Sequence, residues 1–339
     1  MRAVGDRPGL RPLQRRSHAL PKVRFARNGQ TRGGTAFCPL SGLPGRGFLF
    51  CKEGENTVSE RQKGTLFVFL AAVLYSIGGL CIKVIPWSGM AINGGRTAIA
   101  IVIVGFYLWK TGHKLRLNRW VLLGAMAVSG TNILFSVSNK LTTAANAIVL
   151  QFTAPIFVIL ISLMFLGKRP TKLDVMACVV VFSGVMCFFM DSISSGNLLG
   201  DILALISGIS YAGVFMLNDL PDNDPISSVF FGQLCSAVIG FPFLLQETQF
   251  TSTALISLVI LGVFQVALGY IFLTIGLKTT PPVTASLVSG IEPVLNPILV
   301  AVFYHEYIGP AALVGAVIVV GGVIVYNAIL ARQKAPSSI

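Results

Sequence analysis

Long apolar runs, separated by short polar breaks, constrain the fold of this chain more than any other feature. From Thr65 onward, runs of roughly 17 to 22 residues follow one another, and a helix needs about 20 apolar residues to cross the hydrocarbon core of a bilayer. Charged residues make up 12% of the 339 residues, about half the share that is usual in soluble proteins. The sequence therefore predicts an all-α polytopic membrane protein.

The runs predict ten transmembrane helices in two halves of five. In the first half they lie at residues 65–83, 89–109, 120–139, 142–165 and 174–190. In the second half they lie at residues 199–218, 226–245, 254–275, 280–303 and 311–330. We accordingly expect two structural repeats, at residues 61–195 and 196–331, followed by a cytoplasmic tail at residues 332–339.

The two halves share a sequence pattern as well as a number of helices. The stretch KLTTAANAIVLQFTAPIFVILISLMFLGKRP, from Lys140, recurs as KTTPPVTASLVSGIEPVLNPILVAVFYHEYIGP, from Lys278. At this constant offset, identical residues coincide at Lys140/Lys278, Thr142/Thr280, Ala147/Ala285, Pro155/Pro293 and Phe165/Phe303. Because each half has an odd number of helices, the second half must insert with the opposite orientation. Inverted repeats of this kind occur in secondary transporters.

Lysine and arginine in the short loops predict the orientation, because cytoplasmic loops are enriched in both residues. With the start of the first helix in the cytoplasm, the inside segments carry most of them: Arg61, Lys63, Lys110, Lys114, Arg116, Arg119, Lys168, Arg169, Lys172, Lys278, Arg332 and Lys334. The outside then carries Lys83 and Lys140, both at helix ends. We therefore expect a multi-pass protein of the plasma membrane with both termini inside.

The net charge of +13 is concentrated near the N-terminus. Residues 1–57 hold 11 of the 26 Lys and Arg residues but only 3 of the 13 Asp and Glu residues. The basic composition is therefore a poor argument for a nucleic-acid partner. Residues 1–60 are rich in Arg, Pro and Gly and lack helical or strand periodicity, which predicts a disordered basic extension. The alternative is that translation starts at Val58, from a GTG codon directly before the first helix.

The stretch from Lys140 and its repeat carry a resemblance to a known family, together with ALISGISYAGVFM around Tyr211 and GGRTAIAIVIV around Arg96. The chain resembles the EamA-domain family of the drug/metabolite transporter superfamily over about residues 64–330. The resemblance implies two EamA units around a central cavity that serves the transport of small metabolites, often as export.

One position departs from this family. A Glu often follows the Gly at the end of the fourth helix, but this chain has Lys168 there, and the equivalent residue of the second half is Glu306. A role for a symmetric pair of carboxylates is therefore not carried over.

Two ionisable residues lie inside apolar runs, where a charge is costly unless it is paired or hydrated. Arg96 lies roughly 10 Å below the outer boundary of its helix, and Glu292 lies roughly 18 Å from the inner boundary, close to the midplane. We predict that both face one cavity, where Arg96 binds an anionic group of the substrate and Glu292 binds a cationic group or a proton. The alternative is structural: they form an ion pair, or Arg96 caps backbone carbonyls.

Polar residues on other helices are candidates to complete this cavity: Tyr75, Asn132, Gln151, Tyr211, Gln233, Gln265 and Tyr270. Asn296, one turn after Glu292 on the same helix, is a further candidate. Alternatively, each makes one hydrogen bond between helices. Pro155 and Pro293 lie at matching depths, and a proline removes a backbone hydrogen bond and kinks its helix. We predict hinges at both prolines, the alternative being static kinks that aid packing.

Motifs of soluble enzymes and of ATP binding are missing, since the sequence has no HExxH, GxSxG, GxGxxG or P-loop. The six cysteines form no CxxC, and no histidine has a metal ligand at a suitable spacing. We therefore expect no enzyme activity, no catalytic residue, no cofactor and no metal site.

These observations favour a secondary transporter of small metabolites, with amino acids or related zwitterions as suggested substrates and alternating access as its mechanism. Its expected partners are a small-molecule substrate and the lipid bilayer. Small residues in the fifth and tenth helices, such as Gly184 and Gly322, predict close helix packing, either of peripheral helices or in a homodimer. The alternative function is an intramembrane enzyme acting on lipid or prenyl substrates, for which only Arg96 and Glu292 are suitably placed.

Overall fold

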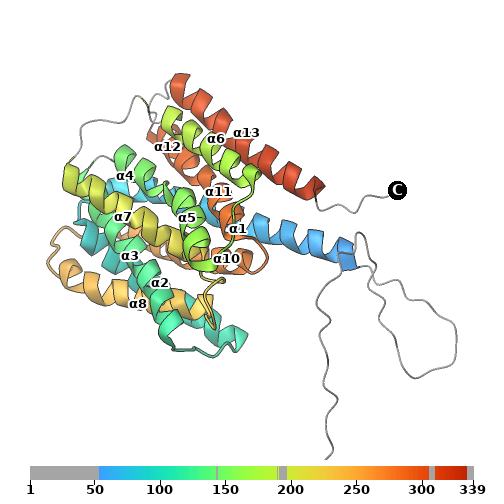
Figure 1. Ribbon diagram of the computed structural model, residues 1–339. Coiled ribbons are helices and arrows are strands. Elements are labelled where there is room, and N and C mark those ends of the chain that lie inside the picture. Colours follow the sequence, from blue (N-terminus) through green and yellow to red (C-terminus); the bar gives the residue numbers. More distant parts are fainter. Residues whose placement is uncertain (1–52, 143, 189, 191–196, 305–309, 334–339) are drawn as a thin grey trace, which may run out of the picture. The chain divides into compact units, whose positions relative to one another are not determined.

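The computed structural model describes residues 53–142, 144–188, 190, 197–304 and 310–333, and the regular elements in these residues are all helices (Figure 1). The first half contains α1 (Glu53–Val84), α2 (Gly89–Thr111), α3 (Arg119–Leu141), α4 (Ala144–Gln151), α5 (Ala154–Leu166) and α6 (Lys172–Phe188). The second half contains α7 (Leu198–Phe215), α8 (Pro225–Leu244), α9 (Ser252–Ile260), the π-helix η1 (Leu261–Leu268), α10 (Gly269–Leu277), α11 (Pro282–Val288), the 3-10 helix η2 (Ser289–Ile291), α12 (Glu292–Tyr304) and α13 (Pro310–Arg332). The all-α fold class is confirmed.

Each of the ten predicted runs folds into one or more helices, and three runs are divided. The run at 142–165 becomes α4 and α5, the run at 254–275 becomes α9, η1 and α10, and the run at 280–303 becomes α11, η2 and α12. Within the described residues, 8 spans are long and apolar enough to cross a membrane. The divided run at 280–303 and the 17-residue α6 are not among these 8.

The first helix begins inside the segment that was predicted to be a disordered extension. α1 starts at Glu53, and Lys63 Nζ lies 2.8 Å from Glu60 Oε1, one turn away on the same helix face. Oppositely charged pairs at this spacing stabilise a helix. Residues 53–60 are therefore helical, which corrects that part of the prediction, and residues 1–52 lie outside the described part of the chain.

Pro155 and Pro293 interrupt equivalent helices of the two halves. α4 ends at Gln151 and α5 begins at Ala154, with Pro155 in its first turn. Pro293 is the second residue of α12, directly after the 3-10 helix η2. Because a proline has no N–H to donate to the preceding turn, each half carries a helix break at this depth. A hinge function of the breaks stays a prediction.

The two helix breaks contact one another. A Cβ on Gly290, in η2, would lie 2.8 Å from the tip of the Phe152 ring, which belongs to the first break. Gly290 is also the counterpart of Phe152 at the offset of the repeated stretch. The missing side chain at Gly290 therefore lets the broken helices of both halves pack together.

Contacts between helices recur with the two halves exchanged. α2 packs against α8 and α6 against α13, so that each of these helices meets its own counterpart. α3 packs against α7, and the equivalent elements η1 and α10 pack against α1. In Figure 1, α6 and α13 run side by side. This exchange of partners is what two structural repeats produce.

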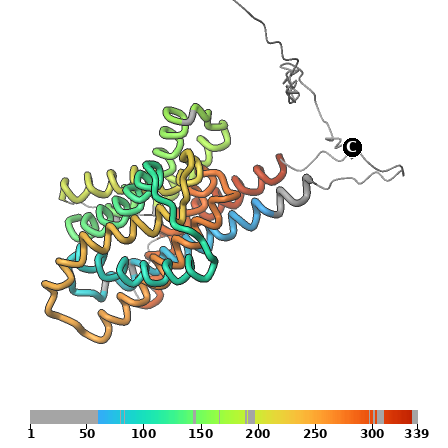
Figure 2. Tube along the Cα trace, turned by 90° about the horizontal axis from the view of Figure 1, so that it is seen from below, coloured from blue at the N-terminus to red at the C-terminus, as the bar shows by residue number. Residues whose placement is uncertain are grey.

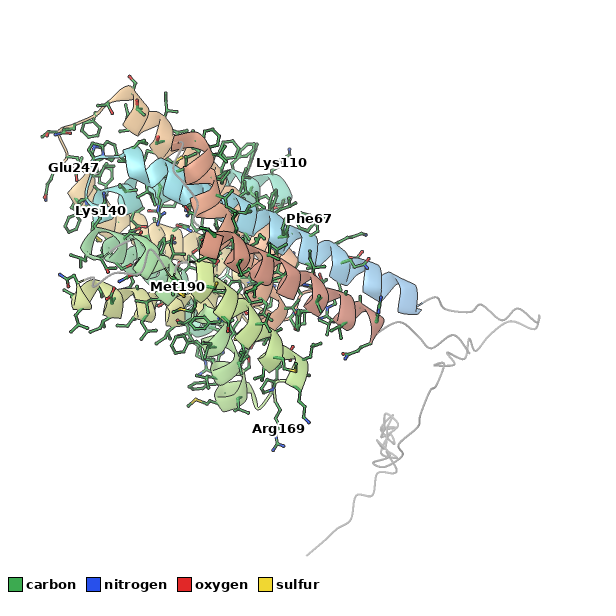
Figure 3. The ribbon with its side chains drawn as sticks, turned by 90° about the horizontal axis from the view of Figure 1, so that it is seen from above. Phe67, Lys110, Lys140, Arg169, Met190 and Glu247 are labelled. Atoms are coloured by element: carbon green, nitrogen blue, oxygen red, sulfur yellow. The ribbon has the colours of Figure 1, made fainter. Side chains whose placement is uncertain are left out.

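The start of α1 and the end of α13 lie at the same end of the helical bundle (Figures 1 and 2). Hydrogen bonds join α1, α11 and α13 at this end. Arg61 Nη2 donates to Thr284 Oγ1 at 3.4 Å, and Tyr326 Oη lies 3.1 Å from the same Thr284 oxygen. Figure 3 places Lys140 and Glu247 together at the opposite end.

Small residues in α6 and α13 bring these two helices together. A Cβ on Gly184 would lie 2.9 Å from side-chain atoms of Ile318 and Val319. Away from this contact, α13 presents apolar side chains such as Val317, which is 73% exposed, as expected of a helix that faces lipid. The predicted close packing is thus used within the chain, and the homodimer stays a prediction.

Candidate functional site

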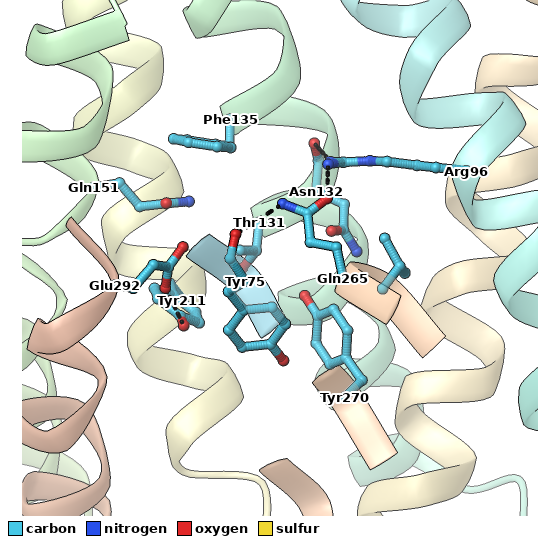
Figure 4. Close-up of a pocket in the computed structure, with 11 residues that line it drawn as sticks. Tyr75, Arg96, Thr131, Asn132, Phe135, Gln151, Tyr211, Gln265, Tyr270 and Glu292 are labelled. Carbon is cyan, nitrogen blue, oxygen red and sulfur yellow. Dashed lines mark hydrogen bonds between the residues drawn. The ribbon is translucent and has the colours of Figure 1, made fainter. Parts of the chain in front are cut away.

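A polar cavity lies between the two halves of the bundle (Figure 4). It offers about 40 Å³ of space for water, enough for a few water molecules. Its lining comes from both halves: Tyr75, Arg96, Thr131, Asn132, Phe135, Gln151, Tyr211, Gln265, Val266, Tyr270 and Glu292. Because both halves contribute side chains, any movement of one half against the other changes the cavity.

Arg96 forms one side of the cavity and is 3% exposed. Its Nη1 donates to Gln265 Oε1 at 3.1 Å. Its Nη2 donates to Ser136 Oγ at 2.8 Å, to Asn93 Oδ1 at 3.3 Å and to the Asn132 carbonyl at 3.5 Å. All four acceptors are neutral. They accept hydrogen bonds from Nη1 and Nη2 but do not compensate the positive charge of the guanidinium.

Arg96 has no carboxylate within ion-pair distance among the residues that the structure describes. Its Nε also has no hydrogen-bond partner within that part of the chain. A buried charge is usually paired, because desolvation is costly. The alternative of a direct ion pair with Glu292 is not observed, and Figure 4 shows these two residues on opposite sides of the cavity.

Glu292 forms the opposite side, together with Tyr211. The Tyr211 hydroxyl donates to Glu292 Oε2 at 3.3 Å. Glu292 is the first residue of α12 and Gln151 the last residue of α4, so the two helix breaks deliver both side chains into the cavity. A carboxylate in this position can accept a proton or a cationic group.

Aromatic rings close the space between these two sides. Tyr75 and Tyr270 meet edge to face with ring centroids 5.7 Å apart, and Tyr211 packs on Phe215 at 4.6 Å. The Tyr75 hydroxyl is buried without a hydrogen-bond partner in the described residues. Because buried hydroxyls are nearly always partnered, this group is available to a bound molecule or to water.

Gln265 links the two halves across the cavity. It lies in η1, and π-helical segments often occur at functional sites. Its Nε2 donates to the Tyr75 carbonyl at 3.3 Å, while its Oε1 accepts from Arg96. A Cβ on Gly78 would collide with this amide, so the glycine provides the room for Gln265.

The predicted site residues fall into two groups. Those that line the cavity are Tyr75, Arg96, Asn132, Gln151, Tyr211, Gln265, Tyr270 and Glu292. Gln233 is fully buried behind them and accepts a hydrogen bond from Asn132 Nδ2 at 3.4 Å. Asn296, one turn after Glu292, is buried but does not line the cavity.

Several residues of the site were not predicted from the sequence: Asn93, Thr131, Phe135, Ser136 and Val266. Asn93 precedes Arg96 by three residues and Ser136 follows Asn132 by four. Residues at these spacings share a helix face, so this pattern was a usable signal. The apolar Phe135 and Val266 gave no such signal, because apolar residues fill every run.

Comparisons with known proteins agree with this architecture. The model of the EamA-like transporter family matches the chain twice, at residues 62–190 and 198–328. An uncharacterized transporter of Clostridium kluyveri is 25% identical over 304 residues, which cover 78% of this chain and 94% of the relative. The uncharacterized transporter YwfM of Bacillus subtilis is 26% identical over 286 residues, which cover 80% and 95%.

A solved structure described as "Crystal structure of protein" has the same fold. It superimposes with a TM-score of 0.68 at 19% sequence identity and covers 80% of this chain and 99% of its own. Because the two family matches together span most of the sequence, this chain belongs to the EamA-like transporter family.

Proposed function

We propose that this protein is a secondary transporter of small zwitterionic metabolites, such as amino acids. One observation carries the proposal: the cavity between the halves has a buried arginine on one side and a carboxylate on the other (Figure 4). A substrate with a carboxylate and an ammonium group complements both sides. A hydrogen bond to a charged group contributes about 1.5–3 kcal/mol, so each end of the substrate would add substantial affinity.

The proposed mechanism is alternating access by rocking of the two halves. Contacts between the halves exist at both ends of the bundle. At one end Tyr326 Oη donates to Asp174 Oδ1 at 2.7 Å, and at the other end the Ser88 N–H donates to Glu247 Oε1 at 2.8 Å. Such small sets of hydrogen bonds can open at one end while the other stays closed, which supports this cycle.

We propose a plasma-membrane location with both termini inside, and export as the direction of transport. The distribution of Lys and Arg over the loops supports the orientation. Export is supported by the resemblance to the EamA-domain family. The alternative of an intramembrane enzyme is less well supported, because the relatives are named as transporters.

Ligand-dependent thermal stability of the purified full-length protein tests the proposed substrate class. A ligand that binds the folded state must raise the melting temperature. Amino acids, nucleosides, sugars and organic cations would be compared at two pH values, and we expect amino acids to stabilise. The same compounds should lose their effect in both Arg96→Ala and Glu292→Gln.

The contrary outcome is equally clear. Stabilisation by a neutral sugar or nucleoside, unchanged in both variants, would contradict the zwitterion proposal. A variant could also lose the stabilisation by ligand because it no longer folds. The melting temperature of each variant without ligand is therefore the control.

A further inference from the structure

We propose that Gln265 determines substrate specificity by leaving Arg96 without a counter-ion, so that the carboxylate of a substrate takes that place. This inference rests on the proposed transport function of the cavity. It assigns the selection of anionic groups to a neutral residue that holds the guanidinium in position.

The contacts of Gln265 require an amide. Its Nε2 donates to the Tyr75 carbonyl at 3.3 Å and its Oε1 accepts from Arg96 Nη1 at 3.1 Å. A carboxylate could accept from Arg96 but could not donate to the carbonyl. The amide is therefore the side chain that satisfies both neighbours and adds no charge.

The Tyr75 carbonyl and the Arg96 guanidinium together fix the orientation of this amide. Because a carbonyl needs a donor and a guanidinium needs an acceptor, the nitrogen of Gln265 must face α1 and its oxygen must face α2. The glycine at position 78 opens the space for the amide nitrogen. The π-helix η1 places the side chain in the cavity, where it is 8% exposed.

The charge of Arg96 consequently stays available to a ligand. Its four described acceptors are neutral, and its remaining Nε–H has no partner within the described residues. A carboxylate at position 265 would form an internal ion pair with Arg96 in place of this arrangement. The cavity would then lose its preference for substrates that carry a carboxylate.

Acid and amide forms of one compound test this preference directly. The probes are leucine and phenylalanine, each compared with its carboxamide, and the readout is the apparent affinity from thermal stabilisation. In Gln265→Glu we expect the acids to weaken by about tenfold or more, as for loss of one charge-assisted contact, and the carboxamides to keep their affinity. Equal weakening of acids and carboxamides would overturn the inference.

Gln265→Met is the matched control, because it removes both hydrogen bonds without adding charge. If Gln265 were only a packing contact, the Met and Glu variants would affect the acids to the same extent. We expect Gln265→Met to weaken acids and carboxamides alike, and by less than the effect of Gln265→Glu on acids.

A measurement without ligand separates this inference from the proposed function. In a double-mutant cycle, Gln265→Glu in the Arg96→Met background leaves the introduced carboxylate without its partner. We expect the melting temperature to fall by more than the sum of the single changes. Purely additive shifts would show that position 265 does not reach the charge of Arg96, and would overturn the inference.

Failure of every acid probe to bind the wild-type protein would instead contradict the proposed function, and the cycle alone would then decide the role of Gln265.

Discussion

Glu292 is the residue on which coupling to protons would depend. Its carboxylate is held by the Tyr211 hydroxyl at 3.3 Å, inside the cavity and at the break between η2 and α12. Glu292→Gln keeps an acceptor for Tyr211 but cannot take up a proton. Because this variant should also bind substrate weakly, we expect its residual flux in proteoliposomes, measured at saturating substrate, to show no response to an imposed pH gradient. Tyr211→Phe keeps the carboxylate and should retain that response. A pH response in Glu292→Gln equal to that of the wild-type protein would remove this residue from the coupling mechanism.

At the scale of the elements, the crossing of α2 and α8 depends on two glycines. A Cβ on Gly94 would collide with the backbone of Gly240, which cannot move aside as a side chain can. We expect Gly94→Ala to destabilise the protein by about 1–3 kcal/mol, as overpacking does, and to lower its melting temperature in detergent. Gly105→Ala on the same helix is the control, because its nearest neighbour is Phe230 at 3.7 Å. If both variants melted at the same temperature, the close crossing would not limit the stability.

For the whole molecule, the proposed orientation places Lys140 outside and Arg169 inside. Both side chains are exposed, and Figure 3 shows Lys140 at the end opposite the start of α1. In a cysteine-free background, a membrane-impermeant maleimide should label Lys140→Cys in intact cells and Arg169→Cys only after permeabilisation. The reverse pattern would invert the orientation, and labelling of both in intact cells would refute the crossing of α4 and α5 between them.

Much of the site could be predicted from residue type alone. Arg96 and Glu292 stood out because charges are rare in apolar runs, and the structure brings both to one cavity. Gln233 and Asn296 carried a similar signal but lie outside the lining. Helical spacing shows which residues share a face of one helix, but not what that face meets. The sequence therefore could not tell a polar side chain that faces the cavity from one that contacts a neighbouring helix.

The membrane-spanning, all-α fold, the duplication and the two helix breaks could be predicted from the amino-acid sequence, because run length, repeat offset and proline chemistry are local properties. The position of Gln265 between Arg96 and Tyr75, and the neutral acceptors around the guanidinium, could be found only in the folded chain. These contacts join α2, α1, α3 and η1, and the π-helical turn at Gln265 shifts the register of its helix. The physical reason is that a charge is compensated by whatever lies next to it in space, which depends on how helices far apart in the sequence pack.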